Sequence, residues 1–179
     1  MEQALDEAIR LRAARVRLMI FDVDGILTDG SLHFGADGEM MKRFHVLDGH
    51  GMKLLQENGI VTALLSARSS PIVGRRAADL GIPHVAQGVH DKRAALQQLC
   101  TATGIGADDC GFIGDDWLDL PVLTRIGFSA SVPGAHAEVR RRVHYVTRAG
   151  GGQGAAREVC DLLLRAQDKY QGALARYLA

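Results

Sequence analysis

Apolar runs and amphipathic segments alternate along the chain. Five short runs rich in β-branched and aromatic residues are typical of buried strands, at positions 16–21, 60–65, 110–114, 128–132 and 144–147. Several of the segments between them carry apolar residues at helical spacing. Strands that alternate with helices in this way predict an α/β fold, a Rossmann-like parallel sheet with helices on both faces.

Three of the helices have recognisable start signals. Asp48 is a candidate cap for a helix that ends at Gly59, and Asp91 for a helix later in the chain. Ser70 stands directly before a proline and opens a helix that ends at Gly81. One short strand fits between this helix and the one that follows Asp91.

Two stretches depart from the alternation. Residues 31–46 have alternating apolar positions around a Gly/Asp turn, which predicts a β-hairpin inserted after the first strand. Residues 148–179 form a C-terminal tail that begins with the glycine-rich GGGQG and continues as a helical stretch. We expect residues 1–179 to form a single domain, because a chain of this length supports one core.

Composition narrows the class of protein. Hydrophobic residues make up 47% and charged residues 23%, which excludes a disordered or collagen-like chain. The 21 basic and 21 acidic residues cancel, so no general field attracts nucleic acid or a membrane surface. No apolar stretch is long enough for a membrane span or a signal peptide. The three cysteines form no CxxC pair, and we expect reduced thiols in a cytoplasmic protein.

Two carboxylates follow the first predicted strand directly. Asp22 and Asp24 lie in FDVDGILTDG, at the carboxyl end of the strand, where open α/β sheets bind ligands. Gly25 allows a tight turn that keeps both acids at the rim. Two carboxylates at one mouth repel each other unless a cation joins them, so the pair indicates a metal site.

Further polar residues occur where later strands end and helices begin. Ser66 ends the second strand, Lys92 begins a helix, and Asp115 follows the strand CGFIG. A nucleophilic acid, a hydroxyl, a lysine and more acids therefore come together in a fixed order. This set is what phosphoryl transfer through an aspartyl-phosphate needs.

These motifs resemble the four motifs of the haloacid dehalogenase-like phosphohydrolases, and the likeness covers most of the chain. The resemblance and the chemistry imply the same roles. Asp22 attacks phosphorus, while Asp24 protonates the departing alkoxide and then takes a proton from the hydrolytic water. Ser66 donates to a phosphoryl oxygen, and Lys92 offsets the charge of the transition state.

The same resemblance implies Mg²⁺ as cofactor. Asp22 and Asp115 are its expected carboxylate ligands, together with the backbone carbonyl of Asp24. Asp116 and Asp119 are expected just outside this ligand set, and Asp116 would orient metal-bound waters or the Lys92 ammonium.

A narrower likeness rests on DVDGILTDG, VLDGHG, GDDWLDLP and YVTRAGGGQGAAREVCDLLL. These segments are similar to family members that act on the phosphate of an eight-carbon sugar acid. The implied substrate is a small sugar-acid phosphate, bound by Asp24, His45, Val46, Leu47, Asp48, Gly49, Lys53, Arg68, Arg76 and Lys92. Some related phosphatases carry arginine where Leu47 and Lys53 stand, which leaves a nine-carbon acid of the sialic acid type open as substrate.

The spacing of the motifs leaves no room for a cap domain. An open site must therefore recognise its substrate by other means, and a neighbouring subunit is the first candidate. The edges of the 31–46 hairpin favour assembly, and the resemblance implies a homotetramer built through such hairpins. The glycine-rich tail either reaches a neighbour's site, as the resemblance implies, or packs back on its own sheet.

Two readings from other classes compete with an enzyme. A phospho-accepting receiver domain also uses aspartates, a hydroxyl and a lysine on a parallel sheet. Such domains lack a proton-transferring aspartate two residues after the phosphorylated one, so the pair of Asp22 and Asp24 argues against this reading. A silent assembly module is the other alternative, but none of the chemical residues is missing.

Overall fold

The sheet has six parallel strands in the order β5-β4-β1-β6-β7-β8. The computed structural model describes residues 6–178. The strands are β1 (Leu18–Phe21), β4 (Val61–Leu65), β5 (His84–Ala86), β6 (Cys110–Ile113), β7 (Phe128–Ser131) and β8 (Tyr145–Val146). The predicted α/β fold is therefore confirmed, and β5 is the short strand expected before Lys92.

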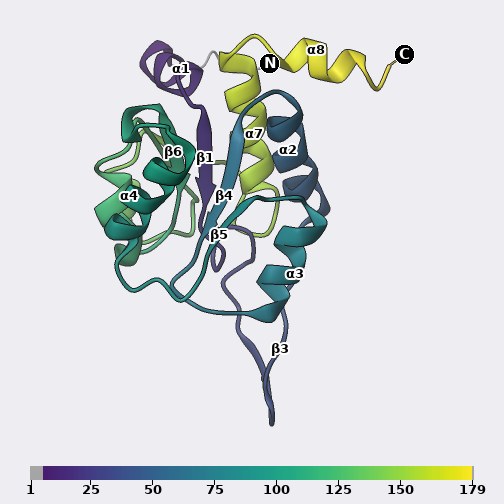
Figure 1. The fold of residues 1–179 in the computed structure, drawn as a ribbon, viewed down its shortest axis with the longest axis vertical. Coiled ribbons are helices and arrows are strands. Elements are labelled where there is room, and N and C mark those ends of the chain that lie inside the picture. The colour runs from purple at the N-terminus through teal and green to yellow at the C-terminus, as the bar shows by residue number, and fades with distance from the viewer. Residues whose placement is uncertain (1–5, 179) are drawn as a thin grey trace.

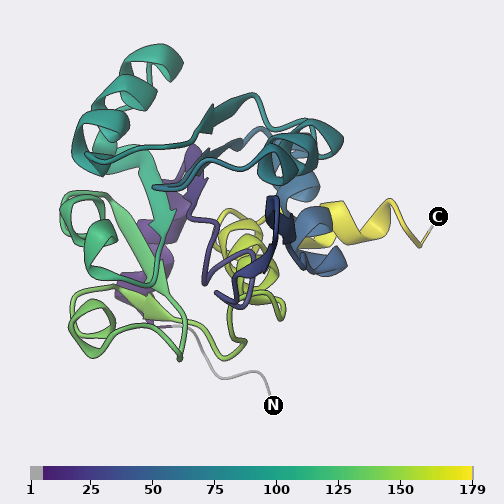
Figure 2. The ribbon, with the colours of Figure 1, turned by 90° about the horizontal axis from the view of Figure 1, so that it is seen from below.

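Helices cover both faces of the sheet (Figure 1). Figure 1 shows α2, α3 and α7 on one face and α4 on the other, and Figure 2 shows α2 and α7 side by side. The central strand β1 is buried along its whole length. The helices are α1 (Glu7–Ala14), α2 (Val46–Glu57), α3 (Pro71–Asp79), α4 (Lys92–Thr103), α5 (Leu120–Leu123), α6 (Ala137–Arg140), α7 (Ala155–Ala166) and α8 (Tyr170–Ala175), with 3₁₀ turns at Ala107–Asp109 and Trp117–Asp119.

Two of the three predicted helix caps are correct. The side chain of Ser70 accepts a hydrogen bond from the backbone of α3, and that of Asp91 accepts one from the backbone of α4. The third prediction is wrong, because α2 begins at Val46 with His45 before it, and Asp48 lies inside the first turn.

Asp48 instead caps the neighbouring helix α7. Its Oδ1 accepts a hydrogen bond from the backbone N–H of Arg157 at 2.8 Å. The residue that precedes α7 is Gly154, which has no side chain to do this. The side-by-side packing of α2 and α7 thus brings a buried carboxylate to the start of α7, where backbone N–H groups need acceptors.

We expect Asp48→Ala to lower the free energy of unfolding by about 1–2 kcal/mol, the usual loss when a cap is removed. Asp48→Asn keeps an acceptor oxygen and should retain most of the stability. Urea denaturation of both variants measures the difference. Equal losses in the two variants would show that the negative charge, and not the acceptor atom, stabilises α7.

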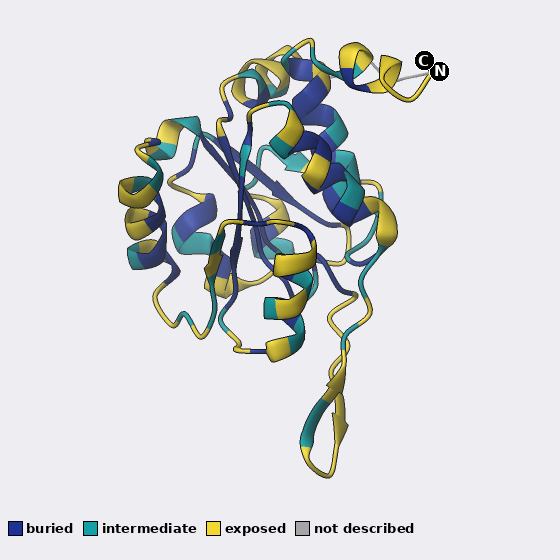
Figure 3. Cartoon of the chain, turned by 45° about the vertical axis from the view of Figure 1, so that its right-hand side comes forward, coloured by how far each residue is buried: buried dark blue, intermediate teal, exposed yellow. Residues whose placement is uncertain are grey.

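The predicted hairpin is present and projects from the body at the carboxyl edge of the sheet (Figure 1, Figure 3). Its antiparallel strands are β2 (His33–Gly35) and β3 (Gly38–Met41). Phe34 is 58% exposed and Met40 67% exposed, so the hairpin presents apolar side chains to solvent. Residues 6–178 contain no cap domain, as the spacing of the motifs predicted.

Most of the predicted tail, residues 148–166, packs on the body of its own subunit. Helix α7 is part of the subunit's own core and packs against α2 and α1. The glycines before it pack on the subunit's own loop after β1, since a Cβ at Gly151 would lie 1.9 Å from the carbonyl oxygen of Gly25. Only α8 projects, at the opposite edge from the hairpin (Figure 1). Residues 148–166 thus take the second of the two arrangements expected for the tail.

The three cysteines are free thiols, as expected from their spacing. Among residues 6–178, no helix combines the length and the apolar character that a bilayer span requires.

Candidate active site

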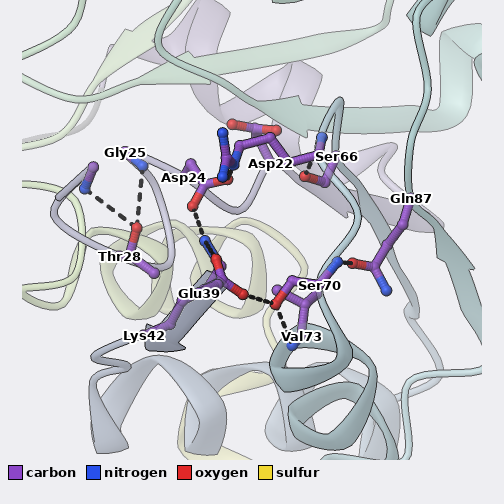
Figure 4. Close-up of polar contacts among 12 residues, drawn as sticks. Asp22, Asp24, Gly25, Thr28, Glu39, Lys42, Ser66, Ser70, Val73 and Gln87 are labelled. Atoms are coloured by element: carbon purple, nitrogen blue, oxygen red, sulfur yellow. Dashed lines mark hydrogen bonds and ion pairs between the residues drawn. The ribbon is translucent and has the colours of Figure 1, made fainter. Parts of the chain in front are cut away.

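The carboxyl ends of the central strands bring the predicted chemical residues to one edge. Asp22 directly follows β1, Ser66 follows β4, and Asp115 lies two residues after β6. Lys92 is the first residue of α4. Figure 4 shows Asp22, Asp24 and Ser66 close together at this edge.

Lys92 joins two carboxylates at the centre of the site. Its Nζ lies 2.7 Å from Oδ1 of Asp22 and 2.5 Å from Oδ1 of Asp119, and its side chain is buried. Burial alone would lower the pKa of Lys92, but the charges of Asp22 and Asp119 outweigh this effect and raise it. The ammonium therefore stays charged where a phosphoryl group would arrive.

Asp119 positions both Lys92 and the loop after β6. Its Oδ2 accepts hydrogen bonds from the backbone N–H groups of Asp115 at 2.9 Å and Asp116 at 3.1 Å. Asp116 itself is exposed. One of the two roles expected for Asp116, the contact with the Lys92 ammonium, is made instead by Asp119, a turn further along. The other role, orienting metal-bound waters, stays a prediction.

The acids of the site are crowded. Carboxylate oxygens of Asp22, Asp115 and Asp119 lie within 4.8 Å of one another. Burial and then the charge of Asp119 raise the pKa of Asp22 to about 7, although Lys92 opposes the shift. Burial and the charges of Asp119 and Asp116 raise the pKa of Asp115 to about 7 as well.

This crowding fits a hard divalent cation. Both oxygens of Asp119 already accept hydrogen bonds, so Asp22 and Asp115 are the carboxylates left to bind a metal. Gly25 makes room for the second of them, since a Cβ at this residue would lie 2.1 Å from Oδ2 of Asp115. Carboxylate oxygens at close range are the ligands that Mg²⁺ prefers.

Asp24 and Ser66 line the same mouth. Oδ1 of Asp24 accepts a hydrogen bond from Lys42, and its Oδ2 lies 3.7 Å from Nε of Arg68. Oγ of Ser66 accepts a hydrogen bond from the backbone N–H of Arg68 at 3.3 Å. The hydroxyl proton of Ser66 can then be donated to a ligand oxygen.

Three side chains in this region were not predicted from the sequence. Glu39 lies in strand β3 of the hairpin, Lys42 directly follows that strand, and Ser70 precedes α3 (Figure 4). A glutamate three residues before a lysine on a hairpin normally indicates solvated surface. The one available signal was that the hairpin is inserted directly after the strand that carries Asp22 and Asp24.

The predicted substrate residues fall into three groups. Asp24, Lys92 and Arg68 lie in the site described above. Gly49 and Arg76 are in contact, since a Cβ at Gly49 would lie 2.4 Å from Nη2 of the arginine. The guanidinium of Arg76 also lies over the ring of Phe44. The others lie along the start of α2: His45 half-buried, Asp48 buried at the α7 cap, and Val46, Leu47 and Lys53 exposed. Their contact with substrate stays a prediction.

Known proteins similar in sequence support this chemistry. A family model described as haloacid dehalogenase-like hydrolase matches residues 82–158. The 3-deoxy-D-manno-octulosonate 8-phosphate phosphatase of Yersinia pestis is 44% identical over 94% of this chain and 89% of its own length. The enzyme of the same name from Escherichia coli strain K12 is 42% identical over 90% of this chain and 86% of its own length.

Solved structures give the same result. The Moraxella catarrhalis phosphatase of that name, in complex with a magnesium ion, a phosphate ion and a KDO molecule, superposes with a TM-score of 0.92 at 41% identity, over 94% of this chain and 97% of its own. The cobalt-bound phosphatase from Haemophilus influenzae superposes with a TM-score of 0.88 at 41% identity, over 92% of this chain and 99% of its own. The chain therefore belongs to the haloacid dehalogenase-like hydrolases and is a phosphomonoesterase among them.

Proposed function

We propose that this enzyme hydrolyses 3-deoxy-D-manno-octulosonate 8-phosphate (KDO 8-phosphate) to KDO and inorganic phosphate, in the cytoplasmic supply of KDO for lipopolysaccharide. The observation that carries the proposal is the cluster of the buried Asp22, Lys92 and Asp119 with the half-buried Asp115, on a fold that a relative shares in its complex with magnesium, phosphate and KDO. The likeness to phosphatases over most of the chain argues against the receiver and silent-module readings.

The positions of the side chains support the following steps. A carboxylate oxygen of Asp22 attacks phosphorus, and the bond between phosphorus and the sugar oxygen breaks. Asp24 gives its proton to the departing alkoxide and, as a carboxylate, later takes a proton from the water that attacks the aspartyl-phosphate. Lys92 and Ser66 stabilise the phosphoryl oxygens through charge and hydrogen bonding.

Mg²⁺ fits the same mouth. The carboxylates of Asp22 and Asp115 and the backbone carbonyl of Asp24 would hold it. When bound, the ion supplies positive charge that offsets the repulsion between an attacking carboxylate and a dianionic phosphate. Asp119 keeps Asp115 in place through the backbone of the loop after β6.

We expect Mg²⁺ to raise the melting temperature of the metal-free protein more at pH 8 than at pH 6. In the folded protein the pKa of Asp22 and that of Asp115 are both about 7, above the ordinary value of 3.8. Between pH 3.8 and pH 7 the folded protein therefore binds more protons than the unfolded chain does. These two groups therefore lower the stability of the metal-free protein as pH rises towards 7. At pH 6 the metal must displace their protons, whereas at pH 8 it relieves charge repulsion.

Differential scanning fluorimetry with EDTA-treated protein measures this shift. Asp115→Asn is the control variant and should lose most of the response to Mg²⁺. A shift of equal size at both pH values would contradict the placement of the metal between Asp22 and Asp115.

A comparison of substrates tests the proposed activity. Phosphate release is measured with Mg²⁺ for KDO 8-phosphate, a sialic acid 9-phosphate and neutral sugar phosphates. We expect the largest kcat/KM for KDO 8-phosphate. A larger value for the nine-carbon acid would favour the alternative that Leu47 and Lys53 leave open.

The proposal includes a homotetramer assembled through the hairpin. Phe34 and Met40 are well exposed on a two-stranded sheet whose outer edges are unpaired among residues 6–178. Apolar surface and free strand edges favour burial against other copies of the chain. Light scattering after size-exclusion chromatography measures the assembly, and a monomer at micromolar concentration would contradict this part.

A further inference from the structure

Lys42 is a lysine buried at the base of the hairpin, next to the site but outside the four motifs. Its side chain is 2% exposed. The Nζ atom donates to Oδ1 of Asp24 and lies 3.0 Å from Oε1 of Glu39 (Figure 4). A buried ammonium is costly unless carboxylates satisfy it, so these two contacts explain why the lysine can lie there.

Glu39, the hairpin residue that pairs with Lys42, is held in turn by a contact with the start of α3. Glu39 accepts a hydrogen bond from Oγ of Ser70, the residue that caps α3. The backbone N–H of Ser70 donates to Oε1 of Gln87 at 2.8 Å. A chain of contacts thus runs from the loop after β5 through α3 and the hairpin to the carboxylate of Asp24.

We propose that Lys42 is a positioning residue that holds the Asp24 carboxylate in place for both proton transfers, an inference that rests on the proposed phosphatase mechanism. With Oδ1 bonded to Lys42, the proton that Asp24 gives to the leaving alkoxide resides on Oδ2. The same oxygen then accepts the proton of the hydrolytic water. Without Lys42 the carboxylate is free to rotate about its side-chain bonds, and fewer enzyme molecules hold Oδ2 in line with the reacting oxygens.

Two simpler roles for Lys42 predict other results than a positioning role does. If Lys42 bound the substrate, its removal would raise KM. If it only tied the hairpin to the body, its removal would lower stability and would act independently of Asp24. A positioning role predicts a lower kcat at nearly constant KM, together with dependence on Asp24.

The test uses Lys42→Met, which keeps the length of the side chain and removes the ammonium. With KDO 8-phosphate we expect kcat to fall at least tenfold while KM changes less than about threefold. With p-nitrophenyl phosphate, whose leaving group departs without a proton, acid-quenched enzyme should hold more phosphoenzyme than wild type, because its hydrolysis still needs Asp24. Arg43→Met is the matched control, since Arg43 is an exposed neighbour that pairs with Asp29, and its kinetics should be those of wild type.

A double-mutant cycle decides whether Lys42 acts through Asp24. Lys42→Met should cost almost nothing further in a protein that already carries Asp24→Asn. A multiplicative loss in the double variant, or a raised KM with full kcat, would overturn the proposal. Should Lys42→Met fail to fold, the cycle is run with Lys42→Arg, which keeps the charge but moves the donor atoms. A loss of kcat in that variant that multiplies with the loss caused by Asp24→Asn would overturn the proposal equally.

The aryl phosphate also separates this inference from the proposed substrate. Wild-type enzyme that turns over p-nitrophenyl phosphate but not KDO 8-phosphate would refute the substrate alone. The phosphoenzyme measurement and the double-mutant cycle would then test Lys42 on the aryl phosphate.

Discussion

Asp22→Asn is expected to lower the turnover number by at least a hundredfold, to the limit of detection in a phosphate-release assay. An amide has no carboxylate oxygen with which to attack phosphorus, and it is a poorer ligand for a hard cation. Asparagine has nearly the same shape as aspartate, and Lys92 keeps its second partner, Asp119, at 2.5 Å. The variant should therefore fold and lose the chemistry.

A melting temperature close to that of wild type is the control for Asp22→Asn. Acid-quenched enzyme should contain no phosphoenzyme, even with an activated aryl phosphate. A purified variant that keeps more than about a hundredth of the wild-type rate would show that another group is the nucleophile.

Asp24→Asn is expected to cost about 10²- to 10⁴-fold in kcat, the usual range for a positioned proton-transfer group. The loss should be largest for a sugar phosphate, whose alkoxide leaving group needs a proton. Phosphoenzyme should still form from an aryl phosphate and should persist, because the water that hydrolyses it has lost its base. Rapid quench followed by protein mass spectrometry measures this accumulation.

The step that each variant loses distinguishes the roles of the two acids. Asp22→Asn removes formation of the phosphoenzyme, whereas Asp24→Asn mainly removes its breakdown. Two variants with the same behaviour on an aryl phosphate, or an Asp24→Asn enzyme as fast as wild type, would contradict the assignment.

The sheet and the centre of the site could be predicted because both follow from the pattern of apolar and polar residues over short stretches of sequence. Buried strands such as β1 are short apolar runs, and their chain order with helices between them favours parallel pairing. The carboxyl ends of parallel strands lie at one edge, so Asp22, Ser66 and Asp115 had to approach one another. Lys92 was placed by the same rule, at the helix that follows β5.

The parts that were wrong or unpredicted depend on contacts between distant segments. Asp48 has the sequence position of a cap for its own helix, but the packing of α2 on α7 gives it the backbone of Arg157. From the sequence alone Lys42 is expected to be a surface lysine, because its contact with Asp24 forms only in the folded protein. Which of the two arrangements residues 148–166 take depends on how far α7 is buried, and the apolar pattern alone does not define this.

The contact between Gly25 and Gly151 bears on how this enzyme could be evolved towards other substrates. A methyl group at position 151 would meet the carbonyl of Gly25, and one at position 25 would meet the carboxylate of Asp115. Random libraries that include either glycine would consist largely of inactive clones. Val46 and Leu47 are exposed on α2 and are predicted substrate contacts. A library confined to these two positions would test that prediction and would leave both glycines, and the contacts they make, unchanged.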